Sequence, residues 1–119
     1  MKTIFVVDDS DTNLAAAEEA LEDYYNILTV PSAAKMFSLL GKVRPDLILL
    51  DIEMPVTGGF DALRQLKESN SWADIPVIFL TRTINASIEE QSKKLGALDI
   101  IMKPFLASIM IKRIQEHIG

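Results

Sequence analysis

The chain has 119 residues, enough for one domain with a single hydrophobic core and too few for two. Its formal charge of -5 argues against direct nucleic-acid binding, because that function needs a basic face. The sequence contains no cysteine, which excludes disulfides and thiolate metal sites, and no apolar run approaches the length of a membrane span. Acids also interrupt the N-terminal apolar stretch too early for a signal peptide, so we expect one cytoplasmic domain over residues 1–119.

Short β-rich runs alternate with longer amphipathic segments along the chain. The runs predict strands over residues 3–7, 26–30, 46–50, 75–80 and 99–102. They are continuous apolar runs rather than in-out alternations, a pattern typical of parallel strands that are covered on both faces.

The five segments that follow these strands have apolar residues at helical spacing. They begin near Ser10, Ser32, Gly59, Ile84 and Leu106. The fourth has a sparse apolar stripe. The fifth has more apolar residues than one helical face, so either a dimer or domain contact or a broad core-facing stripe explains it. Five such β-α repeats predict an α/β fold, an open, doubly wound parallel sheet with helices on both faces.

Polar residues stand where four of the predicted strands end. Asp8 and Asp9 follow the first strand, Asp51 the third, Thr81 the fourth and Lys103 the fifth. Ligands of open α/β sheets bind outside the carboxyl ends of the strands. We therefore expect three carboxylates, one hydroxyl and one ammonium group to converge at this edge.

Such a group of side chains suits phosphoryl transfer. Clustered carboxylates need a hard divalent cation, and all-oxygen ligation with few protein groups favours Mg²⁺. A carboxylate can attack phosphorus to form an aspartyl phosphate, whose transition-state charge Mg²⁺, Lys103 and a hydroxyl could stabilise. We predict that Asp8 and Asp9 hold magnesium and that Asp51 accepts the phosphoryl group; the alternative is that these acids only cap turns and helices.

Four motifs in this order resemble those of the response-regulator receiver domain of two-component signalling. They are "VVDD" (6–9), "LLDIEMPVTGG" (49–59), "FLT" (79–81) and "KPF" (103–105), and the resemblance covers essentially the whole chain. It implies a bacterial, flavodoxin-like domain with a five-stranded parallel sheet of order 2-1-3-4-5 and five helices.

The resemblance also assigns roles at the metal site. Asp51 matches the phosphorylated aspartate, and Asp9 matches the acid that ligates Mg²⁺ directly. Asp8 matches an acid that acts mostly through water, and the backbone carbonyl of Glu53 matches a further metal ligand.

Three more positions correspond to parts of the family's phosphoryl site. Thr81 matches the switch hydroxyl, Lys103 the lysine that pairs with the phosphate, and Pro104 implies a cis Lys-Pro bond. In the family, the positions of Glu53 and Thr83 tune the lifetime of the phosphate.

The sequence departs from the family pattern at three positions. Ile100 stands where an aromatic switch residue is usual, and Gly58 where an acid often precedes the glycine. Arg82 stands where a small residue usually follows the hydroxyl, and it could crowd the site or reach the phosphoryl group.

The function that the resemblance implies is a phosphoacceptor switch rather than a turnover enzyme. It would take phosphate from a histidine kinase or phosphotransfer protein and change its surface around the fourth helix, fifth strand and fifth helix, where a homodimer could also form. One alternative is a pseudo-receiver for docking or dimerisation, which Ile100 and Arg82 favour. Another is a phosphatase or phosphotransferase with an Asp nucleophile in "DSD" (9–11). A dinucleotide-binding protein is excluded, because no G-x-G-x-x-G motif follows the first strand.

Overall fold

Strands and helices alternate without exception along the chain, and the computed structural model describes all of residues 1–119. The elements are β1 (Thr3–Val7), α1 (Asp11–Leu21), β2 (Asn26–Val30), α2 (Ala33–Leu40), β3 (Leu47–Asp51), α3 (Gly59–Glu68), β4 (Val77–Thr81), α4 (Ala86–Leu95), β5 (Asp99–Met102) and α5 (Ala107–Ile118). None of the helices has the length and apolar character of a bilayer span.

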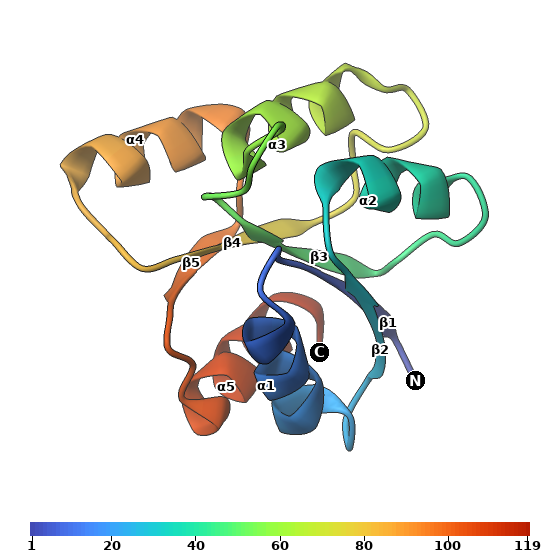
Figure 1. Cartoon of the computed structure of the whole chain (residues 1–119), viewed down its shortest axis with the longest axis vertical. Coiled ribbons are helices and arrows are strands. Elements are labelled where there is room, and N and C mark those ends of the chain that lie inside the picture. Colours follow the sequence, from blue (N-terminus) through green and yellow to red (C-terminus); the bar gives the residue numbers. More distant parts are fainter.

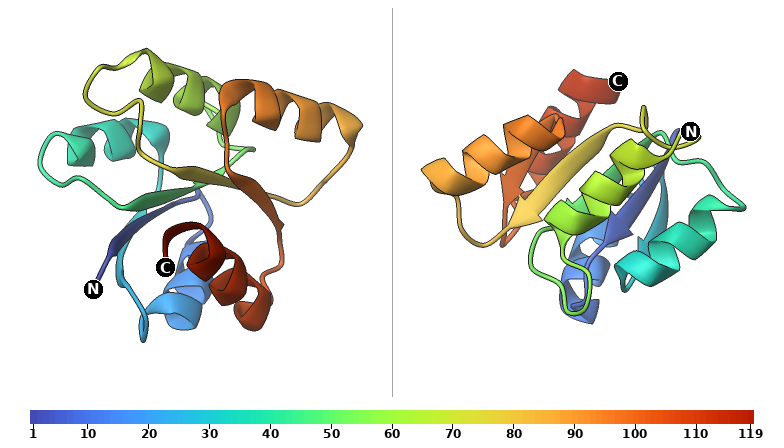
Figure 2. Two further views of the ribbon diagram at one scale, coloured as in Figure 1. Left: turned by 180° about the vertical axis from the view of Figure 1, so that it is seen from behind. Right: turned by 90° about the horizontal axis from the view of Figure 1, so that it is seen from above.

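The five strands form one parallel sheet in the order β2-β1-β3-β4-β5, which confirms the predicted fold and strand order. Helices α2, α3 and α4 cover one face of the sheet, and α1 and α5 cover the other (Figures 1 and 2). The chain order reverses direction between β1 and β3, which places the switch point of the sheet beside the ends of these two strands.

The core consists of two hydrophobic clusters, one on each face of the sheet. Side chains alternate between the faces along each strand. Phe5 and Val7 of β1 accordingly pack with α2 and α3, whereas Ile4 and Val6 pack with α1 and α5. Because both faces are covered, β1, β3 and β4 have almost no solvent-exposed residue.

Burial on both faces was predicted for all five strands, and this is wrong for the two outer ones. In β2 only Val30 is buried, and in β5 only Ile101 is. An outer strand has a neighbour on one side alone, and the helices lie mainly over the middle of the sheet.

The central strand boundaries also differ from the predicted ones. β3 covers 47–51 rather than 46–50, and β4 covers 77–81 rather than 75–80. Both strands therefore include the polar residue that the sequence placed just beyond them, because the backbones of Asp51 and Thr81 still pair with the neighbouring strands.

The helix patterns agree with the sequence. Helix α4 buries only Ser92, in keeping with its sparse apolar stripe. Helix α5 buries Met110 and Ile114, while Leu106 just before it and Ile109 stay exposed, so part of its apolar surface lies outside the core.

Candidate functional site

The carboxyl edge of the sheet brings together side chains that are far apart in sequence. Asp51 and Thr81 are the last residues of β3 and β4, Asp8 follows β1, and Lys103 follows β5. Parallel pairing aligns these ends, since Val7 lies beside Leu50 and Thr81 lies beside Met102. All four side chains are buried.

Lys103 links the two buried carboxylates. Its Nζ donates to Asp51 Oδ1 at 2.9 Å and to Asp8 Oδ2 at 3.2 Å. Backbone amides complete the arrangement, because Glu53 N donates to Asp51 Oδ1 at 3.2 Å and Ser10 N donates to Asp8 Oδ1 at 2.9 Å. Asp51 Oδ2 accepts no hydrogen bond from the protein, so its lone pairs face the site without a protein partner.

Burial dominates the electrostatics of Asp51. Desolvation raises the pKa of this carboxyl to about 7, helped by the charge of Asp8 and opposed by the hydrogen bond and charge of Lys103. Burial of the Lys103 ammonium disfavours its charged form, but the hydrogen bonds and charges of Asp51 and Asp8 outweigh this and raise the pKa of Lys103. The site therefore holds a buried acid whose charge the Lys103 ammonium does not fully compensate.

A third carboxylate makes the group suitable for a metal ion. Oxygen atoms of Asp8, Asp9 and Asp51 lie within 4.8 Å of one another, and Asp9 is exposed to solvent while the other two are buried. All-oxygen donors, with an open side for water, fit a hard divalent cation. The structure thus brings together the three predicted metal-ligating acids.

Thr81 lies at the predicted edge, but its hydroxyl is bonded to Glu53 rather than to Asp51. Its Oγ1 donates to Glu53 Oε1 at 2.7 Å and accepts from Thr83 N at 3.2 Å. The sequence singled out the backbone carbonyl of Glu53 as a metal ligand and its position as one that tunes the phosphate lifetime, but it gave no signal that the Glu53 carboxylate would bond to Thr81.

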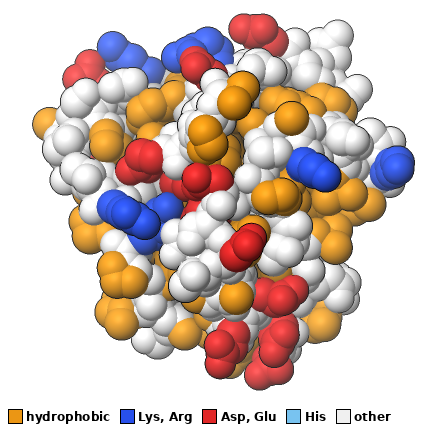
Figure 3. All heavy atoms as spheres, in the orientation of Figure 1, with side chains coloured by type: hydrophobic (Ala, Val, Ile, Leu, Met, Phe, Trp, Pro, Cys, Tyr) orange, Lys and Arg blue, Asp and Glu red, His pale blue; other side chains and the backbone are white.

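These residues surround a polar cavity of about 390 Å³ with no hydrophobic lining. Its lining consists of Asp8, Asp9, Ser10, Asn13, Asp51, Glu53, Arg82, Thr83 and Lys103. Ser10 and Asn13 were not among the predicted site residues. Ser10 is the N-cap of α1 and Asn13 lies in its first turn, and this place beside the acidic pair is the signal that could have found them. Acidic and basic side chains lie side by side near the middle of the face drawn in Figure 3.

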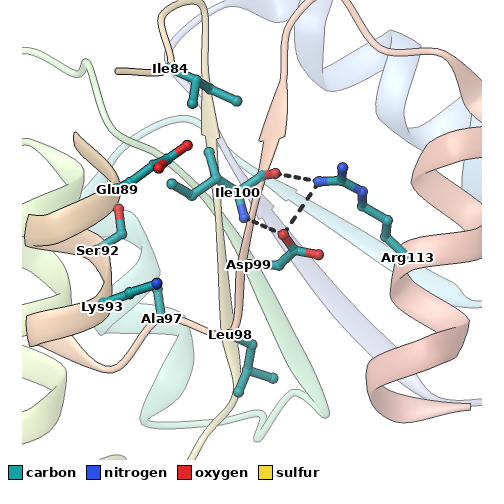
Figure 4. A pocket seen from close by; sticks show the side chains of 9 residues that line it. All are labelled: Ile84, Glu89, Ser92, Lys93, Ala97, Leu98, Asp99, Ile100 and Arg113. Carbon is teal, nitrogen blue, oxygen red and sulfur yellow. Dashed lines mark hydrogen bonds and ion pairs between the residues drawn. The ribbon is translucent and has the colours of Figure 1, made fainter. Parts of the chain in front are cut away.

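Two further predictions concern the residues next to the site. The Lys103-Pro104 peptide bond is cis, as predicted. Ile100 lies half-buried in a separate cavity of about 320 Å³ between α4, β5 and α5, with its side chain directed toward α4 (Figure 4). On the α5 side, Arg113 donates to the Ile100 carbonyl at 2.7 Å and pairs with Asp99 at 3.3 Å (Figure 4).

Comparison with known proteins identifies relatives over nearly the whole chain. Residues 4–115 match the sequence model of the response regulator receiver domain. Protein PilH of Pseudomonas aeruginosa is 32% identical over 96% of this chain and 95% of that protein. A probable cyclic di-GMP phosphodiesterase of Vibrio cholerae is 36% identical over 98% of this chain.

The solved chemotaxis protein CheY4 of Vibrio cholerae superposes with a TM-score of 0.92 and 26% identity, over 98% of both chains. The receiver domain of a histidine kinase from Syntrophus aciditrophicus superposes with a TM-score of 0.87 and 30% identity, over 98% of this chain and 89% of that one. Some relatives are much longer: this chain spans 26% of the phosphodiesterase and 49% of the sensory transduction protein BceR of Halalkalibacterium halodurans.

Proposed function

This chain belongs to the response regulator receiver domain family, the phosphoacceptor domains of two-component signalling, and we propose that Asp51 is its phosphoryl acceptor. The observation that carries the proposal is the environment of the Asp51 carboxylate. Lys103 and the Glu53 amide hold Oδ1, and Oδ2 is left free toward the polar cavity. A buried carboxylate with one fixed and one free oxygen is positioned to act as a nucleophile.

The proposed donor is a phosphohistidine of a sensor kinase or of a phosphotransfer protein. Asp51 Oδ2 attacks phosphorus, the phosphorus–nitrogen bond breaks, and its electron pair returns to the imidazole. The Lys103 ammonium, already 2.9 Å from Asp51, stabilises charge on the phosphoryl oxygens. The product is an acyl phosphate on Asp51.

Mg²⁺ is the cation that we propose for the acidic group. Asp8, Asp9 and Asp51, with the backbone carbonyl of Glu53, would hold it, and water would supply the remaining oxygen ligands. When bound, Mg²⁺ supplies charge neutralisation for the phosphoryl oxygens. Lys103 and the backbone amides of Ser10 and Glu53 hold the carboxylates of Asp8 and Asp51 in place.

Thr81 is the group that we propose to report the phosphorylation. In the structure its hydroxyl is bonded to Glu53, so binding a phosphoryl oxygen requires Thr81 to exchange one partner for another. This exchange would shift the equilibrium between two conformations of the nearby α4–β5–α5 surface. The size of the shift is set by how much more phosphorylation stabilises one conformation than the other. Helix α4 buries only Ser92, which makes it an easily displaced element of that surface.

The test is intact-mass analysis after incubation with acetyl phosphate and Mg²⁺. We expect one phosphoryl adduct that needs Mg²⁺ and is labile to base. Asp51→Asn should lose it, whereas the matched control Asp61→Asn, which changes an exposed acid on α3, should keep it. A folded wild-type chain without an adduct, beside a control receiver that is phosphorylated, would overturn the proposal and favour a docking module.

A further inference from the structure

Arg82 directly follows β4 and lines the cavity that contains Asp51. It also lines an adjoining cavity of about 320 Å³, together with Asn13, Lys103 and Pro104. Its side chain therefore lies between the acidic cavity and its continuation over the loop that follows β5. Arg82 is thus part of the lining of the same cavity as Asp51 and lies within the surroundings that a phosphodonor bound there would meet.

The Arg82 guanidinium has no partner within the protein. Lys103, the other cation of the cavity, is bonded to both Asp8 and Asp51. Arg82 forms no ion pair, although four carboxylates line the same cavity. Of the two cations, Arg82 is the one with no hydrogen-bond donor engaged by the protein, whereas two of the three donors of Lys103 are in use.

The formal charge of the site indicates what the Arg82 guanidinium could compensate. Four carboxylates and two cations line the cavity, so a bound divalent cation would bring its formal charge to zero. Phosphorylation then adds one negative charge, because a carboxylate with one charge becomes an acyl phosphate with two. An arginine fork suits phosphoryl oxygens well, since it can donate two parallel hydrogen bonds.

We propose that Arg82 is a phosphoryl-binding residue of this domain, which donates hydrogen bonds to the phosphoryl oxygens of the incoming donor and of phosphorylated Asp51. The inference rests on the proposed function. With acetyl phosphate, Asp51 Oδ2 forms a bond to phosphorus, the bond from phosphorus to the acetyl oxygen breaks, and acetate leaves with the electron pair. No proton or further reactant is needed. Arg82 accelerates this step by stabilising the charge on the transferred group.

The experiment measures the second-order rate of Asp51 phosphorylation by acetyl phosphate in wild type, Arg82→Gln, Arg82→Lys and the control Arg64→Gln. We expect Arg82→Gln to lower the rate about tenfold through loss of charged hydrogen bonds. Arg82→Lys keeps the charge but not the fork, so about a threefold loss is expected. Arg64 pairs with Asp61 on the surface of α3, and its variant should match wild type.

A second readout separates a role in charge from a role in packing. Removing a cation near three acids should tighten Mg²⁺ binding two- to fivefold in Arg82→Gln, measured by calorimetry, and Arg82→Lys should leave it unchanged. An unchanged or faster phosphorylation of Arg82→Gln, in a protein whose wild type forms the adduct, would overturn the inference and make Arg82 a crowding residue. A wild type without an adduct would instead overturn the proposed function.

Discussion

At the scale of single residues, the fold buries the Asp51 carboxyl at a cost in stability whenever that carboxyl is charged. Its side chain is only 1% exposed, and it shares one lysine with Asp8. Burial and the neighbouring acid raise its pKa to about 7, so the folded protein favours the protonated form of Asp51 more than the unfolded chain does. Charged groups in such surroundings are common where a protein performs chemistry.

Because the charged form of Asp51 is disfavoured in the folded state, we predict that Asp51→Asn is more stable than wild type. The difference in the free energy of unfolding should grow as pH rises. Between pH 3.8, the ordinary pKa of an aspartate carboxyl, and about pH 7, the folded wild type binds more protons than the unfolded chain, so its stability falls with rising pH in that window. Asparagine keeps the side-chain oxygen that accepts from Lys103 but carries no charge. We expect a gain on the order of 2 kcal/mol at pH 8 and little gain at pH 4.5.

Urea unfolding with EDTA at the two pH values measures this difference. Asp61→Asn, which removes an exposed acid, should show no comparable change between them. An Asp51→Asn protein whose advantage is equal at both pH values would contradict the assignment of the raised pKa to Asp51.

At the scale of elements, the junction of β3 and α3 fixes the position of Asp51. Gly59, the first residue of α3, donates its N–H to the Ile52 carbonyl at 2.8 Å. A Cβ atom at Gly59 would lie 2.4 Å from the Asp51 carbonyl oxygen and 2.7 Å from Ile52 Cα. The helix can approach the end of the strand this closely only because residue 59 has no side chain.

We therefore expect Gly59→Ala to destabilise the fold by about 2 kcal/mol, since the obstructing atoms are backbone and must move. Gly41→Ala is the matched control, because its Cβ would meet only the Ser38 carbonyl at 3.4 Å and its φ of -68° suits alanine. The urea midpoints of the two variants give the comparison. Equal midpoints would mean that the contact at Gly59 does not position the β3–α3 junction.

At the scale of the whole molecule, the sheet separates two hydrophobic cores, and its carboxyl edge lies outside both of them. Both hydrophobic clusters lie on the sheet faces, while the polar cavity lies where the strands end. The chain also carries a formal charge of -5, and three of its acids converge at the same edge. Repulsion among these acids is a cost to the entire fold, because the strands that carry them form its centre.

A cation bound at this edge should consequently stabilise the whole chain against unfolding. Ligand binding to the folded state alone adds about 2.7 kcal/mol at a hundred times the dissociation constant. We expect saturating Mg²⁺ to raise the thermal midpoint by several degrees, EDTA to reverse this, and Asp9→Asn to reduce it strongly. Calorimetry measures the midpoints; an equal rise with NaCl at matched ionic strength would show screening rather than a metal site.

The sequence by itself determined the order of elements and the positions of the principal acids and Lys103. Continuous apolar runs identified the strands, helical spacing identified the helices, and Asp8, Asp51 and Lys103 stood at strand ends. Parallel strands bring such ends to one edge whatever the details of packing. The local pattern was therefore enough to predict a shared site for residues up to 95 positions apart.

Only the tertiary structure decided how those side chains are paired. The bond from Thr81 to Glu53, the two partners of Lys103 and the unpaired Arg82 depend on rotamers chosen among segments distant in sequence. The exposure of β2 and β5 likewise depends on where the helices lie across the sheet rather than on the strands' own residues. Residue patterns fix which groups reach the edge, whereas packing between elements fixes which of them remain free to bind.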